Sequence, residues 1–389
     1  MTMSFGNRRR IAGGALLAGA ALLATACSAP GTSSSGNGGG GGGPVKFALI
    51  DAQSGQFSDL GHWEHDGVQL AVDQQNAKGG VCGGRKMTLT QFDDQGDPTT
   101  GTTLAQKVAT GGYIAVFGSA NSGVSLAMAP ILTQAQIPFI TSGQSPKLPE
   151  TGSDYLFMNS PTSTTFDDTL AKYVVTTKGM KSVAMISNNG AYGTGEHDAF
   201  LAALKKLGVT PTDDEVVTPD QKDFSAALTK IRQGNPQALF IGAEEVESGL
   251  IAKQARTLGL TSTFVGGAPI GTPTYISTAG TQVADGSIVS SPYLSNDVNA
   301  KTKAFAAAYQ KKFGQAPEAH GAKAYDGAQI FIKALQNDKC AGGKKLADAI
   351  HNVTYDGLQG HFDFDQQGVG LHQTQIGVVK DGKVVAATS

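Results

Sequence analysis

The chain has 389 residues, of which 30 are Lys or Arg and 32 are Asp or Glu, so its formal net charge is −2 at pH 7. So small a net charge provides no field that would hold nucleic acid, and we exclude nucleic-acid binding. The chain is also too long for one ordinary hydrophobic core, which favours two domains.

Residues 1–26 are typical of an export signal. Arg8, Arg9 and Arg10 precede an apolar segment from Ile11 to Ala24, which is shorter than the roughly 20 residues that a membrane-spanning helix needs. A basic start, a short apolar segment and small residues before the cleavage point define a signal peptide. The arginines also fit a twin-arginine signal, so the export route, Sec or twin-arginine, stays open.

The signal ends at Cys27, which follows the small residues Thr25 and Ala26. This junction resembles the lipobox of bacterial lipoproteins, in which the thiol is acylated and becomes the new N-terminus. Two or more acyl chains anchor a protein stably to a membrane. Residues 27–44 then include six consecutive glycines, Gly38 to Gly43, and we expect them to form a flexible tether between the lipidated cysteine and the folded part.

From Val45 onward, short apolar segments alternate with helical patterns, which predicts parallel sheets with helices on both faces. In the first series we expect strands at 45–50, 87–92, 113–117 and 137–140 and helices at 62–76, 99–110 and 124–134. After a break near Ser160, we expect strands at 182–186, 216–217, 238–241 and 263–265 and helices at 195–207, 224–232 and 248–258. The pattern predicts two Rossmann-like α/β lobes.

The last part of the chain departs from this alternation. Beyond Pro292 we expect two long helices at 299–313 and 320–336, then a strand at 360–364 and a hairpin of strands at 378–379 and 384–385. Asp381 and Gly382 form its turn, since Asp-Gly is a strong hairpin signal.

With Cys27 assigned to the anchor, Cys82 and Cys340 are left as an even pair in an exported protein. This favours a disulfide. We expect both cysteines at the end of the first lobe away from the ligand cleft, where the bridge would tie the helix before Cys340 to the sheet that carries Ser122.

A set of short motifs occurs in a characteristic order along the chain. They are Gln53-Ser54-Gly55, Gln74 to Gly80, Phe92-Asp93-Asp94 with Asp97-Pro98, Ile137 to Thr141, Tyr192-Gly193-x-Gly195, Lys222 to Ser225, Gln254-Ala255-Arg256 with Gly259, and Gly357 with Phe362-Asp363 and Gly368. Each is weak alone, but the ordered set covers residues 45–389. It resembles the solute-binding proteins of branched-chain amino-acid ABC importers, which belong to the type I periplasmic binding protein superfamily.

The resemblance implies two Rossmann-like lobes with a three-strand hinge and a central ligand cleft. Each lobe is then discontinuous in sequence, and we expect the chain to cross near residues 160, 290 and 360. This gives a first lobe of 45–160 with 291–360 and a second lobe of 161–290 with 361–389. The lobes close over the ligand by hinge motion, and an ABC permease recognises the closed form.

The resemblance also implies which residues hold the ligand's carboxylate. Ser122, which follows a buried strand and opens a helix, matches a serine with this role. The next loop, with Ser142, Gly143, Gln144 and Ser145, matches the second anchor. Free N–H groups and hydroxyls at a helix start suit a carboxylate. The alternative is that these residues only cap helices.

Three further regions are expected beside the cleft. Tyr192 matches a second-lobe tyrosine that closes on the ligand, and its ring and hydroxyl suit a small amphipathic molecule. Glu244 and Glu245 follow a buried strand and either receive an ammonium group or form a solvated acidic loop. Trp63 either covers an apolar pocket or packs on the sheet, whereas the family's aromatic residue in this loop aligns nearer Leu60.

One departure from the family concerns the ligand's amine. Where the amino-acid binders place an acid that pairs with the α-ammonium, this chain has Ala268 in the sequence Phe264 to Pro269, which contains no carboxylate. Either Glu244 or Glu245 replaces that acid, or the ligand lacks an amine and is an amide, an aromatic acid or another carboxylate. The ligand and its affinity therefore stay open.

Signals for metal binding and catalysis are weak. His62 and His65 lack a third ligand nearby and the H-E-x-x-H pattern, and no G-x-S-x-G motif is present. We predict no metal, no cofactor and no enzymatic activity.

The sequence thus predicts a monomeric extracytoplasmic solute-binding subunit of an ABC importer, lipid-anchored on the outer face of the cell membrane. It would capture an amino acid or a related small carboxylate or amide and deliver it to a permease that the sequence does not identify. The alternatives are a ligand-sensing receptor lipoprotein on the same fold and a tethered hydrolase.

Overall fold

The computed structural model describes residues 42–294 and 299–387. The predicted signal peptide, Cys27 and nearly all of the linker lie outside these described residues. Within them, no helix combines the length and the apolar character that a membrane crossing requires.

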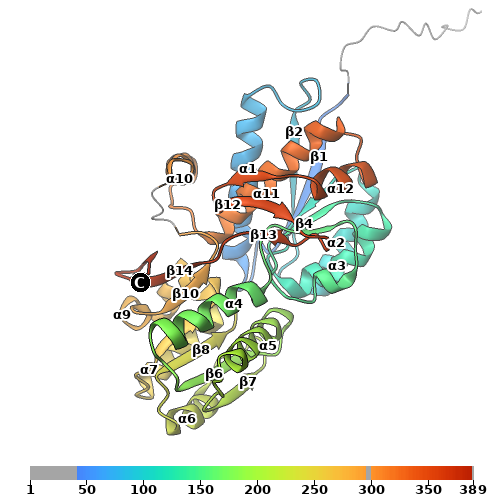
Figure 1. The fold of residues 1–389 in the computed structure, drawn as a ribbon. Helices are drawn as coiled ribbons and strands as arrows, with labels where there is room; N and C mark the ends of the chain where they lie inside the picture. The colour runs from blue at the N-terminus through green and yellow to red at the C-terminus, as the bar shows by residue number, and fades with distance from the viewer. Residues whose placement is uncertain (1–41, 295–298, 388–389) are drawn as a thin grey trace, which may run out of the picture. The chain divides into compact units, whose positions relative to one another are not determined.

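The first sheet is built from the N-terminal third of the chain (Figure 1). Among the described residues it has five parallel strands in the order β2-β1-β3-β4-β5. Their bounds are β1 (Val45–Asp51), β2 (Met87–Asp93), β3 (Val116–Phe117), β4 (Phe139–Thr141) and β5 (Leu156–Met158).

The second sheet contains seven strands within the described ranges, in the order β15-β14-β10-β9-β8-β6-β7. The strands from β10 to β7 run parallel, while β14 and β15 are antiparallel to their neighbours. Their bounds are β6 (Val183–Asn188), β7 (Asp214–Val217), β8 (Ala238–Gly242), β9 (Thr263–Gly266), β10 (Ile288–Ser291), β14 (Gln375–Lys380) and β15 (Lys383–Ala386).

Helices cover both faces of each sheet. The first sheet is accompanied by α1 (Ser58–Ala77), α2 (Pro98–Thr110), α3 (Ser122–Gln134), the 3₁₀ turn Pro149–Thr151, α10 (Ala300–Phe313), α11 (Ala319–Asp338) and α12 (Gly343–His351). The second is accompanied by α4 (Ser163–Lys172), the π-helical turn Tyr173–Thr177, α5 (Ala191–Lys206), α6 (Ser225–Gln233), α7 (Glu245–Thr257), the 3₁₀ turn Ala268–Gly271, α8 (Pro273–Ala279) and α9 (Thr281–Ala284).

The strands are apolar on both sides because both faces of each sheet are buried. In β1, Phe47 and Leu49 belong to the core under α1, α11 and α12, whereas Ala48 and Ile50 belong to the core under α2 and α3. Alternate residues of a strand point to opposite faces, so a doubly covered strand reads as a continuous apolar run. This confirms the predicted α/β class with two sheet-based lobes, the first lobe being the segments packed on the first sheet.

Segments that are distant in sequence complete the first lobe. In Figure 1 the orange-red α11 and α12 lie with the blue α1, and all three contribute to one core. Close approach of α1 to α11 depends on Gly67, because a Cβ there would lie 2.2 Å from the carbonyl oxygen of Gly321. The predicted disulfide is confirmed: Cys82 and Cys340 are bonded across 258 residues of sequence, with their Cα atoms 6.1 Å apart.

The expected crossing near residue 360 needs correction. The small antiparallel sheet of β11 (Tyr355–Gly357), β12 (Gly360–Phe364) and β13 (Gly370–Leu371) lies with the first lobe. Phe362 belongs to the first-lobe core, and the ring of Phe364 is 5.3 Å from that of Phe157. The chain therefore reaches the second sheet only between Leu371 and Gln375, because the packing of these two rings holds β12 on the first lobe.

Most of the predicted helices and strands are present, with shifted ends. Helix α1 begins at Ser58 rather than His62, and only Val116 and Phe117 of the predicted strand 113–117 pair as β3. The hairpin is confirmed, since β14 and β15 pair on either side of Asp381 and Gly382, which both have positive φ. The short strands β5, β10, β11 and β13 and the helices α4, α8, α9 and α12 were not predicted from the sequence.

Candidate functional site

The loop after β3 and the loop after β4 are joined through one serine hydroxyl. Ser122 Oγ accepts hydrogen bonds from the backbone N–H groups of Gln144 and Ser145, at 3.2 and 3.3 Å. The N-terminal cap of α3 is Asn121, whose Oδ1 accepts from the N–H groups of residues 123 and 124. Ser122 therefore links two loops, and the capping role left open by the sequence belongs to its neighbour.

Asp51, at the end of β1, is hydrogen-bonded to the loop after β3. Its carboxylate accepts hydrogen bonds from Ala52 N at 2.9 Å, Ser119 Oγ at 3.0 Å and Ala120 N at 3.2 Å. Burial, with repulsion from Glu64, raises its pKa well above the usual value, although the hydrogen bonds lower it. These bonds fix the backbone that leads into α3.

A buried lysine lies behind the second loop. Lys323 on α11 is fully buried, and its Nζ donates to the carbonyl oxygen of Ser142 at 3.1 Å. Asn159 Nδ2 donates to Ser142 Oγ and to the Lys323 carbonyl oxygen, both at 3.0 Å. Burial lowers the pKa of Lys323, and Glu64, which is 2% exposed on α1, opposes that shift. The amino group of Lys323 is thereby held against the predicted carboxylate-binding loop.

Glu196 is the corresponding buried acid of the second lobe. It is 1% exposed and follows Tyr192 by one turn of α5, so both side chains lie on one helix face. Burial raises the pKa of Glu196 to about 7, against hydrogen bonding from Ser163 and Tyr192. A Cβ at Gly267 would lie 2.7 Å from Glu196 Oε2 and 2.8 Å from the Tyr192 hydroxyl. Glu196 therefore lies beside the segment where the family's acid is missing at Ala268.

Several contacts join the two lobes. Ser163 N donates to the Gln144 carbonyl oxygen at 2.9 Å, and His320 Nε2 on α11 is 3.8 Å from Glu245 Oε1 on α7. The side-chain amide of Gln56 donates to Asp220, and the Thr274 hydroxyl donates to Asp59. The site is therefore closed by residues of both lobes.

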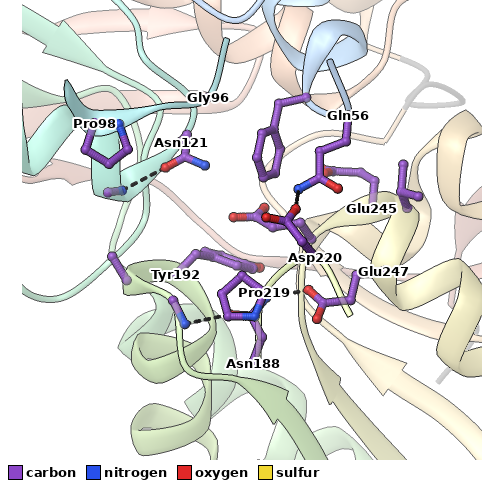
Figure 2. A pocket seen from close by; sticks show the side chains of 16 residues that line it. Gln56, Gly96, Pro98, Asn121, Asn188, Tyr192, Pro219, Asp220, Glu245 and Glu247 are labelled. Carbon is purple, nitrogen blue, oxygen red and sulfur yellow. Dashed lines mark hydrogen bonds between the residues drawn. The ribbon is translucent and has the colours of Figure 1, made fainter. Parts of the chain in front are cut away.

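A cavity of about 230 Å³ lies between the two lobes. Figure 2 shows Gln56 and Asn121 of the first lobe facing Tyr192, Asp220 and Glu247 of the second. The carboxylates of Asp220, Glu244, Glu245 and Glu247 are the charged groups of its lining. Burial raises the pKa of Glu247 to about 7.

The structure brings most of the predicted site residues together. Ser122, Ser142, Gly143, Gln144 and Ser145 form one hydrogen-bonded pair of loops, and Tyr192, Glu244 and Glu245 line the cavity between the lobes. Trp63 is 7% exposed and stacks on His320 with 6.0 Å between the ring centres. His320 lies between Trp63 and Glu245. Leu60 is buried within α1 and is not part of the cavity lining.

The buried residues Glu64, Glu196, Glu247 and Lys323 were not predicted as site residues from the sequence. The one available signal was position, because Glu196 directly follows the Tyr192-Gly193-x-Gly195 motif on a helix start that faces the expected cleft. In the part of the chain that the structure describes, no group of three His, Cys, Asp or Glu side chains could hold a metal ion.

The comparisons with known proteins decide the family. The sequence model described as periplasmic binding protein matches residues 44–383. The chain belongs to the periplasmic binding protein family. One relative is the Leu/Ile/Val-binding protein BraC3 of Rhizobium johnstonii, 30% identical over 356 residues that cover 88% of this chain and 94% of that protein. Another is the Leu/Ile/Val/Thr-binding protein of Salmonella typhimurium, 27% identical, with 83% and 88% covered.

Solved structures agree with this assignment. The isoleucine complex of the substrate-binding protein LivJ from Streptococcus pneumoniae has a TM-score of 0.82 and 26% identity, covering 88% of this chain and 98% of that one. A benzoate complex from R. palustris has a TM-score of 0.81 at 19% identity, with 88% and 95% covered, and supports the fold alone. This periplasmic binding protein is thus an extracytoplasmic solute-binding protein of the ABC-transporter type, not an enzyme.

Proposed function

We propose that this periplasmic binding protein is the lipid-anchored substrate-binding subunit of an ABC importer. It captures an amino acid or a related small carboxylate or amide and delivers it to the permease. Relatives named for leucine, isoleucine and valine support the amino-acid class. The motif at Cys27 supports the anchor.

The observation that carries the proposal is a band of buried polar atoms contributed by both lobes. Gln144 Nε2 in the first lobe and Glu196 Oε2 and Glu245 Oε1 in the second are buried without a hydrogen-bond partner among the described residues. Buried polar groups are nearly always hydrogen-bonded, so such a group in a native protein requires an explanation. A small polar ligand between the lobes would satisfy all three.

The two ends of an amino acid have different partners in this arrangement. The carboxylate is held by the loops around Ser122 and Ser142, with Lys323 behind them as a counter-charge. The ammonium group is held by Glu196 and the Tyr192 hydroxyl. A ligand that contacts both lobes favours the closed form by the free energy of those added contacts, which is the basis of hinge closure.

Thermal unfolding with a panel of candidate ligands tests the cargo. We expect an amino acid, an amide or a small carboxylic acid to raise the Tm, because a ligand at 100 times its Kd adds about 2.7 kcal/mol to the free energy of unfolding. Ser122→Ala should reduce the shift, and it should also lower the Tm of the free protein, because the buried N–H groups of Gln144 and Ser145 lose their acceptor. A panel in which no member of these classes raises the Tm contradicts the proposed cargo.

Cell fractionation tests the anchor separately. Cys27→Ser should release the protein from the membrane fraction, since the acylated thiol is lost, while ligand binding by the purified protein stays unchanged. Retention of the Cys27→Ser variant in the membrane would contradict lipid anchoring. Co-purification of the unmodified protein with permease subunits tests delivery.

A further inference from the structure

The cavity between the lobes carries only negative charge in its lining. Among the described residues that line it, Asp220, Glu244, Glu245 and Glu247 are the charged side chains, and all four are carboxylates. Glu245 is 4% and Glu247 is 8% exposed, and the Oε1 atom of each has no hydrogen-bond partner. Asn188 Nδ2 donates to Glu247 Oε2 at 2.5 Å, so Oε1 is the oxygen of that carboxylate without a hydrogen-bond partner.

Aromatic rings from opposite lobes line the same cavity. Phe57 belongs to the first lobe and Tyr192 to the second. The face of an aromatic ring attracts a cation, and the attraction increases when water is excluded. Two rings and four carboxylates suit a positively charged group and disfavour an anionic one.

The basic groups nearest to this cavity lie outside its lining. Lys222 is exposed and bonded to Gln56 Oε1 at 3.4 Å, His320 Nε2 is 3.8 Å from Glu245 Oε1, and Lys323 donates to the Ser142 carbonyl oxygen. None of these three basic side chains lines the cavity. A buried carboxylate whose charge is only partly compensated is costly, which is why these acids favour a cationic ligand.

We propose that the cavity receives a second cationic group of the cargo, an ammonium or guanidinium remote from the carboxylate, so that the cargo is a basic amino acid or a close relative. This rests on the proposed function, in which Ser122 and Glu196 hold the carboxylate and the α-ammonium. The remote cation then bonds to Glu245 and Glu247 between the Phe57 and Tyr192 rings. A neutral side chain of the same length leaves both acids unpaired.

Lysine and norleucine are the matched probes, because they differ only in the terminal ammonium group. Isothermal titration of the purified chain should give a Kd for lysine at least about tenfold below that for norleucine. Arginine and ornithine should also bind more tightly than leucine. Norleucine or leucine binding as tightly as lysine overturns the inference and leaves the proposed function standing.

Two variants locate the effect. Glu247→Gln and Glu245→Gln should each reduce the lysine-to-norleucine preference several-fold, whereas Glu150→Gln, at an exposed position outside the cavity, should leave the preference unchanged. An unchanged preference in both cavity variants overturns the assignment. The comparison on the unmodified chain stands even if a variant does not fold.

Proton release and amines without a carboxylate complete the test. Titrating lysine in two buffers of different ionisation enthalpy should reveal protons released on binding, since a cation favours the ionised form of acids whose pKa burial has raised. Cadaverine and agmatine distinguish the two proposals. If these amines bind tightly and no amino acid binds, the cation-binding cavity is supported and the amino-acid cargo is contradicted. If neither the amines nor the amino acids bind, both proposals are contradicted.

Discussion

Lys323 is a fully buried cation on α11 whose neighbours are carboxylates of both lobes. Replacing it by Met leaves Glu64 and Glu245 without their counter-charge and removes the donor to the Ser142 carbonyl oxygen. Leaving a buried acceptor without its hydrogen bond costs about 1–3 kcal/mol, and more when a charged group is involved. Urea unfolding should show a loss of this size for Lys323→Met. The control is Lys333→Met, at an exposed position of the same helix, and an equal loss in both variants would contradict the role of Lys323.

Glu196 should decide whether the ligand's amine is recognised. Its Oε2 atom lies beside Gly267, next to the alanine that replaces the family's acid. Glu196→Gln should weaken binding of an α-amino acid about tenfold, since a hydrogen bond to a charged group is lost, but not binding of the matching α-hydroxy acid. Gly267→Ala should weaken both ligands, because its Cβ collides with Glu196 and Tyr192. Equal losses for amino and hydroxy acid in Glu196→Gln would refute the assignment.

These residues also show what a sequence can predict at this scale. Ser122 and Tyr192 belong to motifs with a family counterpart, so their positions could be predicted. Glu64 and Lys323 could not, because a charged residue in a helical pattern is expected to face water. Their burial arises only when α1 packs on α11, a contact between segments that are far apart in the chain.

The disulfide acts at the scale of whole elements, because it joins the segment after α1 to the end of α11. A cross-link that closes a loop of this length restricts the unfolded chain strongly, and removing a native disulfide typically costs about 2–5 kcal/mol. Thermal unfolding should therefore show a lower Tm after reduction and for the Cys82→Ser/Cys340→Ser variant. Reductant should have no further effect on that variant, which is the control. An unchanged Tm on reduction would contradict a stabilising role.

Element prediction succeeded where periodicity extends over several turns and failed where it does not. The helices α1, α2 and α11 have long apolar stripes that predict them well. The strand β5 has three residues, Leu156 to Met158, and takes its partners from β4 and from Val369. The last crossing was misplaced for a related reason. The sequence around Phe362 and Phe364 fits a strand of either lobe, and only the packing of Phe364 on Phe157 and of Phe362 in the first-lobe core decides between them.

The whole molecule should lose stability as the pH rises through the neutral range. Burial raises the pKa of Asp94 to about 6 and that of Glu196, Glu247 and Asp326 to about 7. Between about pH 4 and 7 the folded chain then keeps protons that the unfolded chain, with pKa values of about 4, releases, so the free energy of unfolding falls with rising pH. His372, with its pKa lowered to about 4 by burial, acts in the opposite direction below about pH 6.5.

Four acids outweigh one histidine, so the Tm of the free protein should be higher at pH 5.5 than at pH 7.5, a window that spans the four raised pKa values of about 6 and 7. Glu196→Gln should flatten the profile, because the amide does not titrate. Asp97→Asn is a suitable control, since the pKa of that exposed carboxyl is lowered by hydrogen bonds from Thr100 and its titration lies below the window. A Tm that rises steadily across the window would contradict the balance of groups.

Closure of the two lobes should be visible in the fluorescence of Trp63, the only tryptophan of the chain. Its ring stacks on His320, and His320 Nε2 is 3.8 Å from Glu245 Oε1 of the opposite lobe. A movement of the second lobe therefore changes the surroundings of the stacked pair. Ligand binding should therefore shift the emission maximum or its intensity, with the same midpoint as calorimetric titration. Trp63→Phe should abolish the tryptophan signal while the ligand still raises the Tm. A ligand that raises the Tm of the unmodified protein and leaves its emission unchanged would show that Trp63 does not sense closure, and that His320 and Glu245 do not move relative to each other when the cleft closes.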